Sequence, residues 1–91
     1  MPTRPSQNDP DRVAQWERIR LQVGGRIRQV RLRAGLTQEQ LALASGVTRN
    51  VLIDVEHGRR ALLYERLFDI AEALGVEAHE LLAGGHGQSP L

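Results

Sequence analysis

The chain has 91 residues, a formal net charge of +1 at pH 7 and no cysteine. This length suffices for one small domain with a modest core, and it leaves no room for a sensor or enzyme domain beside it. Without cysteine there is no disulfide or thiol chemistry. No apolar run is long enough to span a bilayer and nothing resembles a signal peptide, so we expect a cytoplasmic protein without membrane contact.

The charge is unevenly distributed along the chain. Residues 1–33 carry eight Arg and three acidic residues, a net charge of +5, whereas residues 34–91 carry four Arg and eight acidic residues, a net charge of −4. Every basic residue is Arg and none is Lys. Guanidinium groups suit bidentate contacts with phosphate and guanine, but a G+C-rich genome produces the same bias and explains it better.

Both ends of the chain are poor in groups that could form a core. Residues 1–9 are polar and contain prolines, so we expect a disordered arm that cannot offset the entropy of ordering. Arg4 would allow this arm to lie along a DNA groove, although an idle tail is the better interpretation. Residues 84–91, GGHGQSPL, are glycine-rich and are expected to form a flexible tail.

Residues 10–22 are predicted to form an extra helix. Asp9 can cap it, and Pro10 suits its first position because that residue's N–H is unpaired in any helix. The pair Gly24-Gly25 either ends this helix or lets it continue at a cost of about 1 kcal/mol per glycine. One side of the helix is apolar and either folds back on the domain, which we favour, or packs against a second subunit; it consists of Val13, Trp16, Ile19 and Val23.

Residues 23–34 show a single apolar face that predicts another helical segment, with Gly35 as its cap. That face consists of Val23, Ile27, Val30 and Ala34. The remaining faces carry arginines, of which we expect Arg26 and Arg33 to be solvated.

The stretch from Thr37 to Gly58, TQEQLALASGVTRNVLIDVEHG, is the part of the sequence that is most informative about function. Thr37 and Gln40 have the spacing of a capping box, so a helix is expected to start here. Gly46 can adopt positive φ at the end of that helix, and Thr48 can cap a second one. Two short helices joined by a tight glycine turn predict a helix-turn-helix.

The second of these helices has one apolar face and one polar face. Val51, Leu52 and Val55 form the apolar face. The first turn of such a helix can reach base edges in the major groove of DNA. The side chains suited to base contact are Arg49 for guanine, Asn50 for adenine, Ile53 for the thymine methyl group and Asp54 for cytosine N4. Asp54 alternatively repels phosphate and so excludes wrong sites. The alternative is an ordinary helical hairpin whose polar face is merely solvated.

The run from Val23 to Leu82 resembles the Xre family of bacterial and phage regulators, whose helix-turn-helix is of the lambda-repressor and Cro type. The most specific matches are GLTQEQLA, SGVTRN, VEHGRR and IAEALGV, in the family's order and near its spacing. The resemblance implies an all-α, compact, five-helix DNA-binding domain over residues 23–83, to which residues 10–22 add an extra helix. It also implies a transcriptional regulator that is usually dimeric on a palindromic operator.

The same resemblance assigns roles to individual residues. It implies a partly buried ion pair between Arg31 and Glu56 that fixes the recognition helix, and losing one partner of such a pair costs about 3 kcal/mol. It further implies contacts with the DNA backbone on both sides of the reading helix. These contacts are assigned to Gln38, Thr48, Arg59 and Arg60.

The segment after Arg60 departs from the family. Where relatives usually place Pro-Ser, this chain has Ala61-Leu62-Leu63-Tyr64 and no capping side chain. These residues either face outward as a subunit interface or complete the core. The next helix contributes Leu67, Ile70, Ala71 and Leu74 to the core and ends at Gly75, and a short fifth helix carries Val76, Leu81 and Leu82. The candidate dimer surface comprises Leu62, Leu63, Tyr64, Leu81 and Leu82.

Catalysis is not expected, because no catalytic residues, metal site or cofactor can be assigned. The histidines at positions 57, 79 and 86 lack metal-ligand spacing, and no phosphate-binding glycine loop is present. The sequence therefore predicts a homodimeric DNA-binding protein that represses transcription from a double-stranded operator. Two alternatives are an antitoxin that regulates its own operon, and a protein-interaction module that has lost DNA binding.

Overall fold

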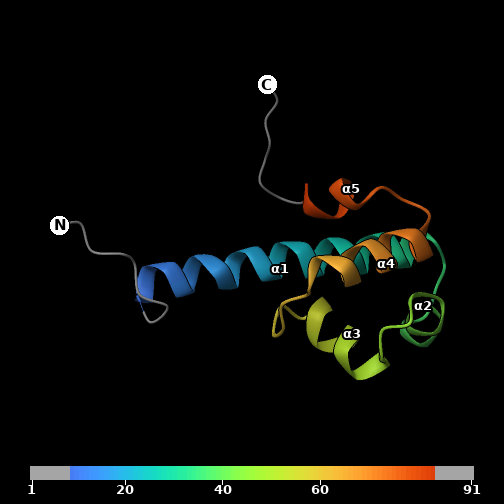
Figure 1. The fold of residues 1–91 in the computed structure, drawn as a ribbon, viewed down its shortest axis with the longest axis horizontal. Helices are drawn as coiled ribbons and strands as arrows, with labels where there is room; N and C mark the ends of the chain where they lie inside the picture. Colours follow the sequence, from blue (N-terminus) through green and yellow to red (C-terminus); the bar gives the residue numbers. More distant parts are fainter. Residues whose placement is uncertain (1–8, 84–91) are drawn as a thin grey trace.

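The computed structural model describes residues 9–83, and in that range it contains helices and no strand. The helices are α1 Pro10–Arg33, α2 Gln38–Ser45, α3 Arg49–Glu56, α4 Tyr64–Leu74 and α5 Ala78–Leu82 (Figure 1). The expected all-α class is therefore confirmed. Of the expected disordered arm only Asp9 is described, and the expected tail, residues 84–91, lies outside the described residues.

Helix α1 runs through Gly24 and Gly25 without a break. Its start is the expected one, since Pro10 is the first helical residue and the Asp9 carboxylate accepts a hydrogen bond of 2.9 Å from the Asp11 amide. The extra helix predicted for residues 10–22 is thus the N-terminal half of α1 and not a separate element. This half projects beyond the other helices (Figure 1). From here on, "the arm" means residues 10–22 of α1 and not the segment before them.

Gly24 lies where α1 crosses the C-terminal end of α3. It is buried, and a Cβ atom at this position would overlap the carbonyl oxygen of Val55 and lie 3.0 Å from that of Glu56. Gly25 is exposed, and a Cβ atom there would meet nothing within 4 Å. The first glycine of the pair therefore serves close packing between two backbones, whereas the second has no such role.

The core lies where the other helices pack on the C-terminal half of α1. Its wholly buried side chains are Ile27, Leu41, Leu52, Ile70 and Leu81. The positions predicted for the core on α4 are all buried. Ala34 is an exception to the predicted pattern, because it follows α1 as its C-cap and is exposed.

The apolar side of the arm does not fold back on the domain as we expected. Val23 packs against the core, but Ile19 and Trp16 are 44% and 38% exposed. Because α1 is continuous, its arm is carried away from the other helices and cannot turn back toward them. The intramolecular role predicted for Trp16 is therefore wrong.

Helix α5 is held against α1 by a side chain that we expected to be solvated. The Arg26 Nε donates a 3.1 Å hydrogen bond to the Glu80 carbonyl, and its Nη1 donates a 2.9 Å bond to Gln29. Charged side chains with a backbone partner satisfy the last carbonyls of a helix.

Within residues 9–83, no helix combines the length and apolar character needed to cross a membrane.

Candidate nucleic-acid interface

Helix α2 begins with the predicted capping box. The Thr37 hydroxyl accepts a 3.0 Å hydrogen bond from the Gln40 amide, and the Gln40 side chain accepts a 2.8 Å bond from the Thr37 amide. The helix ends at Gly46, whose φ of 79° lies in the left-handed region that favours glycine. This short, capped helix sets the start of the turn that leads into α3.

Helix α3 presents its first turn to solvent. Thr48 caps it, since its hydroxyl accepts a 3.3 Å hydrogen bond from the Val51 amide. Leu52 and Val55 are buried against the core, as predicted. On the opposite side of the helix Arg49 and Asn50 are exposed, whereas Ile53 and Asp54 are partly covered. The four side chains predicted to contact bases thus share the outer face of α3, and the two nearest its start are the most accessible.

A buried ion pair holds the other end of α3. The Arg31 guanidinium donates two hydrogen bonds to the Glu56 carboxylate, Nε to Oε2 at 2.7 Å and Nη2 to Oε1 at 3.0 Å. The two side chains are 7% and 0% exposed. The Arg31 Nη1 also donates a 2.9 Å bond to the Leu36 carbonyl. Such bidentate pairing fixes geometry as well as charge, so α3 is held in one orientation relative to α1.

Gln38 belongs to the same network, although we expected its side chain at the DNA backbone. Its Nε2 donates a 3.1 Å hydrogen bond to the Glu56 Oε1 and therefore faces inward. The first amides of α2 still point outward from the helix start, where unpaired N–H groups and the helix dipole favour an anion. Gln38 therefore supports Glu56 with one of its two amide N–H groups, and its contact with the DNA backbone stays a prediction.

The loop after α3 carries two exposed arginines, Arg59 and Arg60. Arg59 is paired with Asp54, with distances to the Asp54 Oδ1 of 3.0 Å from Nη2 and 3.3 Å from Nε. Both side chains are about half exposed, at 58% and 44%. This pairing is not evident from the sequence, because the left-handed turn at Gly58 brings the two side chains together only in the folded loop.

Arg20 is a contributor that the sequence analysis missed. From the arm of α1, its Nε donates a 3.2 Å hydrogen bond to the Gly58 carbonyl, 38 residues away in the sequence. The Gly58 position is also closely covered by Leu21. No local sequence pattern could reveal a contact of this range. The arm thus supports the loop that positions Arg59 and Arg60.

The parts of the interface border a common surface. An open depression is lined by residues from α1, from the start of α2 and from both ends of α3, among them Arg28, Thr37, Arg49 and His57. Glu39 is the one acidic residue among those that line this depression, and Arg28, Arg31 and Arg49 are the basic ones. The start of α3 and the start of α2 therefore lie on the same side of the molecule.

The candidate dimer surface is only partly on the outside. Leu63 and Tyr64 are each 71% exposed and Leu82 is 56% exposed, whereas Leu62 packs against the core. Leu81 is 0% exposed. Its predicted place on the dimer surface is therefore wrong, because α5 turns that side chain into the core and leaves Leu82 outside.

Comparison with known proteins identifies the family. The helix-turn-helix family model matches residues 27–81. The chain is 37% identical over 65 residues to control protein C.BamHI of Bacillus amyloliquefaciens. The aligned residues cover 70% of this chain and 80% of that protein.

Two solved structures extend this likeness. The restriction-modification controller protein C.AhdI of Aeromonas hydrophila has 35% identity and a TM-score of 0.70, covering 71% of this chain and 94% of that one. The hypothetical transcription factor NHTF of Neisseria has 27% identity and a TM-score of 0.70, covering 93% of this chain and 88% of that one. The chain therefore belongs to the Xre-type helix-turn-helix family of DNA-binding transcription regulators.

Proposed function

We propose that this protein binds a palindromic operator as a homodimer and represses transcription, acting as a regulator and not as an enzyme. The observation that carries the proposal is the exposure of Arg49 and Asn50 on the first turn of a helix whose other end is locked by the Arg31–Glu56 ion pair. In a dimer the two reading helices would lie about 34 Å apart, one turn of B-DNA. Where such an operator overlaps a promoter, the bound dimer would block access to it.

The test is selection of bound sequences from a pool of random duplex DNA, followed by a salt titration and a reporter assay. We expect a palindrome with half-sites about one helical turn apart, weaker binding as salt rises, and reduced reporter expression when the protein is present. Absence of any enriched sequence, at a concentration where the fold is intact, would contradict the proposal and favour the protein-interaction module.

Arg49→Ala is predicted to relax specificity at a single operator position. Arg49 is exposed at the start of α3, where its guanidinium can donate two hydrogen bonds to guanine. Losing a bidentate base contact costs about 1–3 kcal/mol of discrimination at that base pair. The measurement is competition binding against operators with each base pair changed in turn. Equal loss of affinity for every sequence would show that Arg49 contacts the backbone instead.

Arg59→Ala is predicted to weaken binding to all sequences and to lower the salt slope by about one unit. Arg59 must exchange Asp54 for a phosphate, which is inexpensive because exposed ion pairs contribute only about 0–1 kcal/mol. Arg66→Ala is the matched control, since Arg66 on α4 forms a similarly exposed pair with Asp69 at 3.2 Å. A salt slope that stays the same in Arg59→Ala, or falls equally in Arg66→Ala, would remove Arg59 from the phosphate contacts.

A second candidate function follows from the names of two similar proteins. One is a control protein and the other a restriction-modification controller protein. We infer that this chain regulates restriction-modification genes, and a reporter carrying the promoters of its neighbouring genes tests this. The candidate fails if the selected operator lies upstream of no restriction or modification gene.

A further inference from the structure

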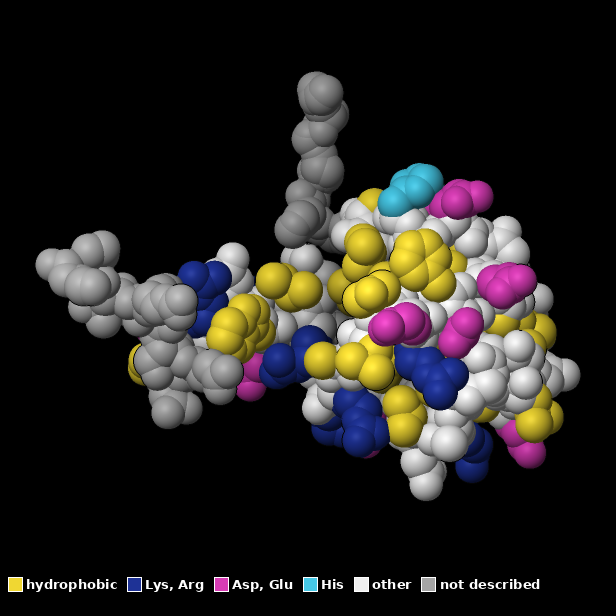
Figure 2. Space-filling model, viewed as in Figure 1, with side chains coloured by type: hydrophobic (Ala, Val, Ile, Leu, Met, Phe, Trp, Pro, Cys, Tyr) yellow, Lys and Arg dark blue, Asp and Glu magenta, His cyan; other side chains and the backbone are white. Residues whose placement is uncertain are grey.

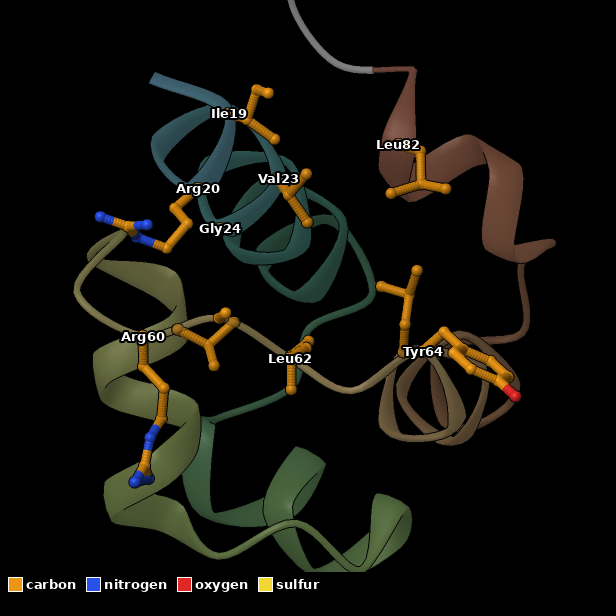
Figure 3. Close-up of a pocket in the computed structure, with 11 residues that line it drawn as sticks. Ile19, Arg20, Val23, Gly24, Arg60, Leu62, Tyr64 and Leu82 are labelled. Carbon is orange, nitrogen blue, oxygen red and sulfur yellow. The ribbon is translucent and has the colours of Figure 1, made fainter. Parts of the chain in front are cut away.

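The arm ends beside an apolar cleft on the surface of the domain. The cleft has a volume of about 320 Å³ and lies between α1, the start of α4 and α5. Its lining includes Ile19 and Val23 of α1, Leu62 before α4 and Leu82 of α5, and Figure 3 shows Val23 and Leu82 facing the same space from opposite sides. Arg60 points away from it in this view. The walls are thus apolar, and the two arginines of the lining stand at its edge.

The apolar side of the arm continues this cleft outward. At 100° per residue, Val23, Ile19 and Trp16 lie on one side of α1, and the first two line the cleft. Trp16 lies one turn farther out and remains 38% exposed. In Figure 2 hydrophobic side chains face the viewer along the arm and over α4 and α5. One surface therefore carries both an apolar cleft and, next to it, a projecting helix with an apolar side.

We propose that the arm is an intermolecular element: in a homodimer, Trp16 of each chain occupies the apolar cleft of the other. This inference rests on the homodimer of the proposed function and assigns the surface that forms it. A projecting helix gains little stability alone, because most helices in proteins depend on packing of their apolar face. An isologous contact between two copies covers both the helix and the cleft.

The size of the cleft favours a side chain over a larger ligand. Its volume is at the lower end of the roughly 300–1,000 Å³ found for small-molecule pockets, and Trp is the residue most typical of anchors that fill such hollows at interfaces. The chain contains a single Trp, and it lies on the arm. The same surface also exposes Tyr64 and Phe68, at 71% and 59%, which provides the surrounding contact area.

Charge supports a second copy of this chain as the partner. Arg12 lies one turn before Trp16 on the same side of the arm, and it is exposed. Glu65 and Glu72 are exposed on α4, and their spacing places them on either side of Phe68. Figure 2 shows acidic side chains over α4 beside the hydrophobic group, with a basic side chain next to them. Arg66 of α4 pairs with Asp69, so Glu65 and Glu72 leave this helix with a net negative charge. An arm that approaches this face from another copy brings a positive charge to a negative surface.

The first test measures association of the full chain by sedimentation equilibrium and by Trp16 fluorescence on dilution. We expect a dimer whose emission shifts to longer wavelength as it dissociates, because Trp16 then becomes exposed to water. Trp16→Ala is expected to raise the dimer dissociation constant by roughly 30-fold or more, as loss of a hot-spot side chain does. Leu32→Ala is the control, since Leu32 is 51% exposed on the other side of α1; it should leave association unchanged.

The second test uses the absence of cysteine from the sequence. A chain carrying Trp16→Cys is mixed with a differently tagged chain carrying Leu82→Cys, and a short bifunctional maleimide is added. We expect a cross-linked product that contains both tags. Arg12→Glu is expected to weaken the dimer several-fold, and combining it with Glu65→Arg and Glu72→Arg should restore association.

The outcomes separate this inference from the proposed function. A Trp16→Ala protein that remains as dimeric as the parent, or absence of the mixed cross-link, overturns the arm contact while operator binding can persist. If the parent protein dimerises but binds no DNA, and its Trp16→Ala variant loses association, the result supports the arm contact and contradicts the proposed function. A parent protein that is monomeric at about 100 µM, far above typical dimer dissociation constants, overturns the arm contact and the homodimer together.

Discussion

Gly24→Ala is expected to destabilise the domain by about 3 kcal/mol or more, at the upper end of overpacking effects. The added methyl group would overlap the carbonyl oxygen of Val55, and both partners are helix backbone that cannot move aside independently. Chemical denaturation followed by circular dichroism measures the effect. The loss is a large share of the total, because a small domain has only about 5–15 kcal/mol of stability.

The neighbouring glycine is the matched control. Gly25→Ala should stabilise the domain by about 1 kcal/mol, since alanine is the better helix former and the site is open. The two variants differ only in which side of α1 receives the methyl group. Equal effects from both, in either direction, would show that α1 does not cross α3 as closely as the structure indicates.

Arg31→Met is expected to cost about 3–5 kcal/mol, because it leaves the buried Glu56 carboxylate without its charged partner. The Leu36 carbonyl loses a hydrogen bond in the same variant. Arg33→Met, at an exposed position on the same helix, should change stability by less than about 0.5 kcal/mol. The measurement is again the free energy of unfolding, from denaturation at a constant pH.

A double variant separates the ion pair from the packing around it. Replacing a buried ion pair by apolar residues of similar volume is often neutral, so Arg31→Met/Glu56→Met should be less destabilised than the sum of the two single variants. We also expect the double variant to bind operator less tightly than the parent even when it is fully folded. The reason is that the Glu56 carboxylate, which holds α3 through Arg31 and Gln38, is lost. Additive losses would mean that the two side chains contribute independently.

Features set by neighbours in the sequence were predicted well. The capping box at Thr37, the left-handed turn at Gly46 and the cap at Thr48 each depend on residues no more than four positions apart. The sequence therefore contains all the groups that form these hydrogen bonds. The alternation of buried and exposed residues on α3 and α4 was predicted for the same reason, since helical periodicity alone decides it.

Features that depend on a distant partner were predicted less well. Whether Gly24 ends a helix or permits a crossing depends on Val55, which lies 31 positions later. Gln38 and Arg26 were assigned to solvent or DNA because their partners, Glu56 and the Glu80 carbonyl, are brought close only by folding. The distant contact between Arg31 and Glu56 was expected only through the family resemblance.

The candidate interface follows the same division. The face of α3 that carries Arg49 and Asn50 is a local property and was predicted from periodicity. The pairing of Asp54 with Arg59 and the support of Gly58 by Arg20 are properties of the folded loop. The roles of these residues toward DNA stay predictions, and the binding experiments above test them.

Because α1 is unbroken, a displacement of the arm is transmitted along this helix to its contacts with α3. Arg20, Gly24 and Arg31 all contact α3 or the loop that follows it, so a tilt of α1 must be accompanied by a tilt of α3. The arm reaches about 21 Å from Gly24 to Pro10 at 1.5 Å per residue, so a 4 Å displacement of its tip corresponds to a rotation of roughly 10°. Under the proposed function, a contact that holds the arm would therefore change the angle at which α3 enters the major groove.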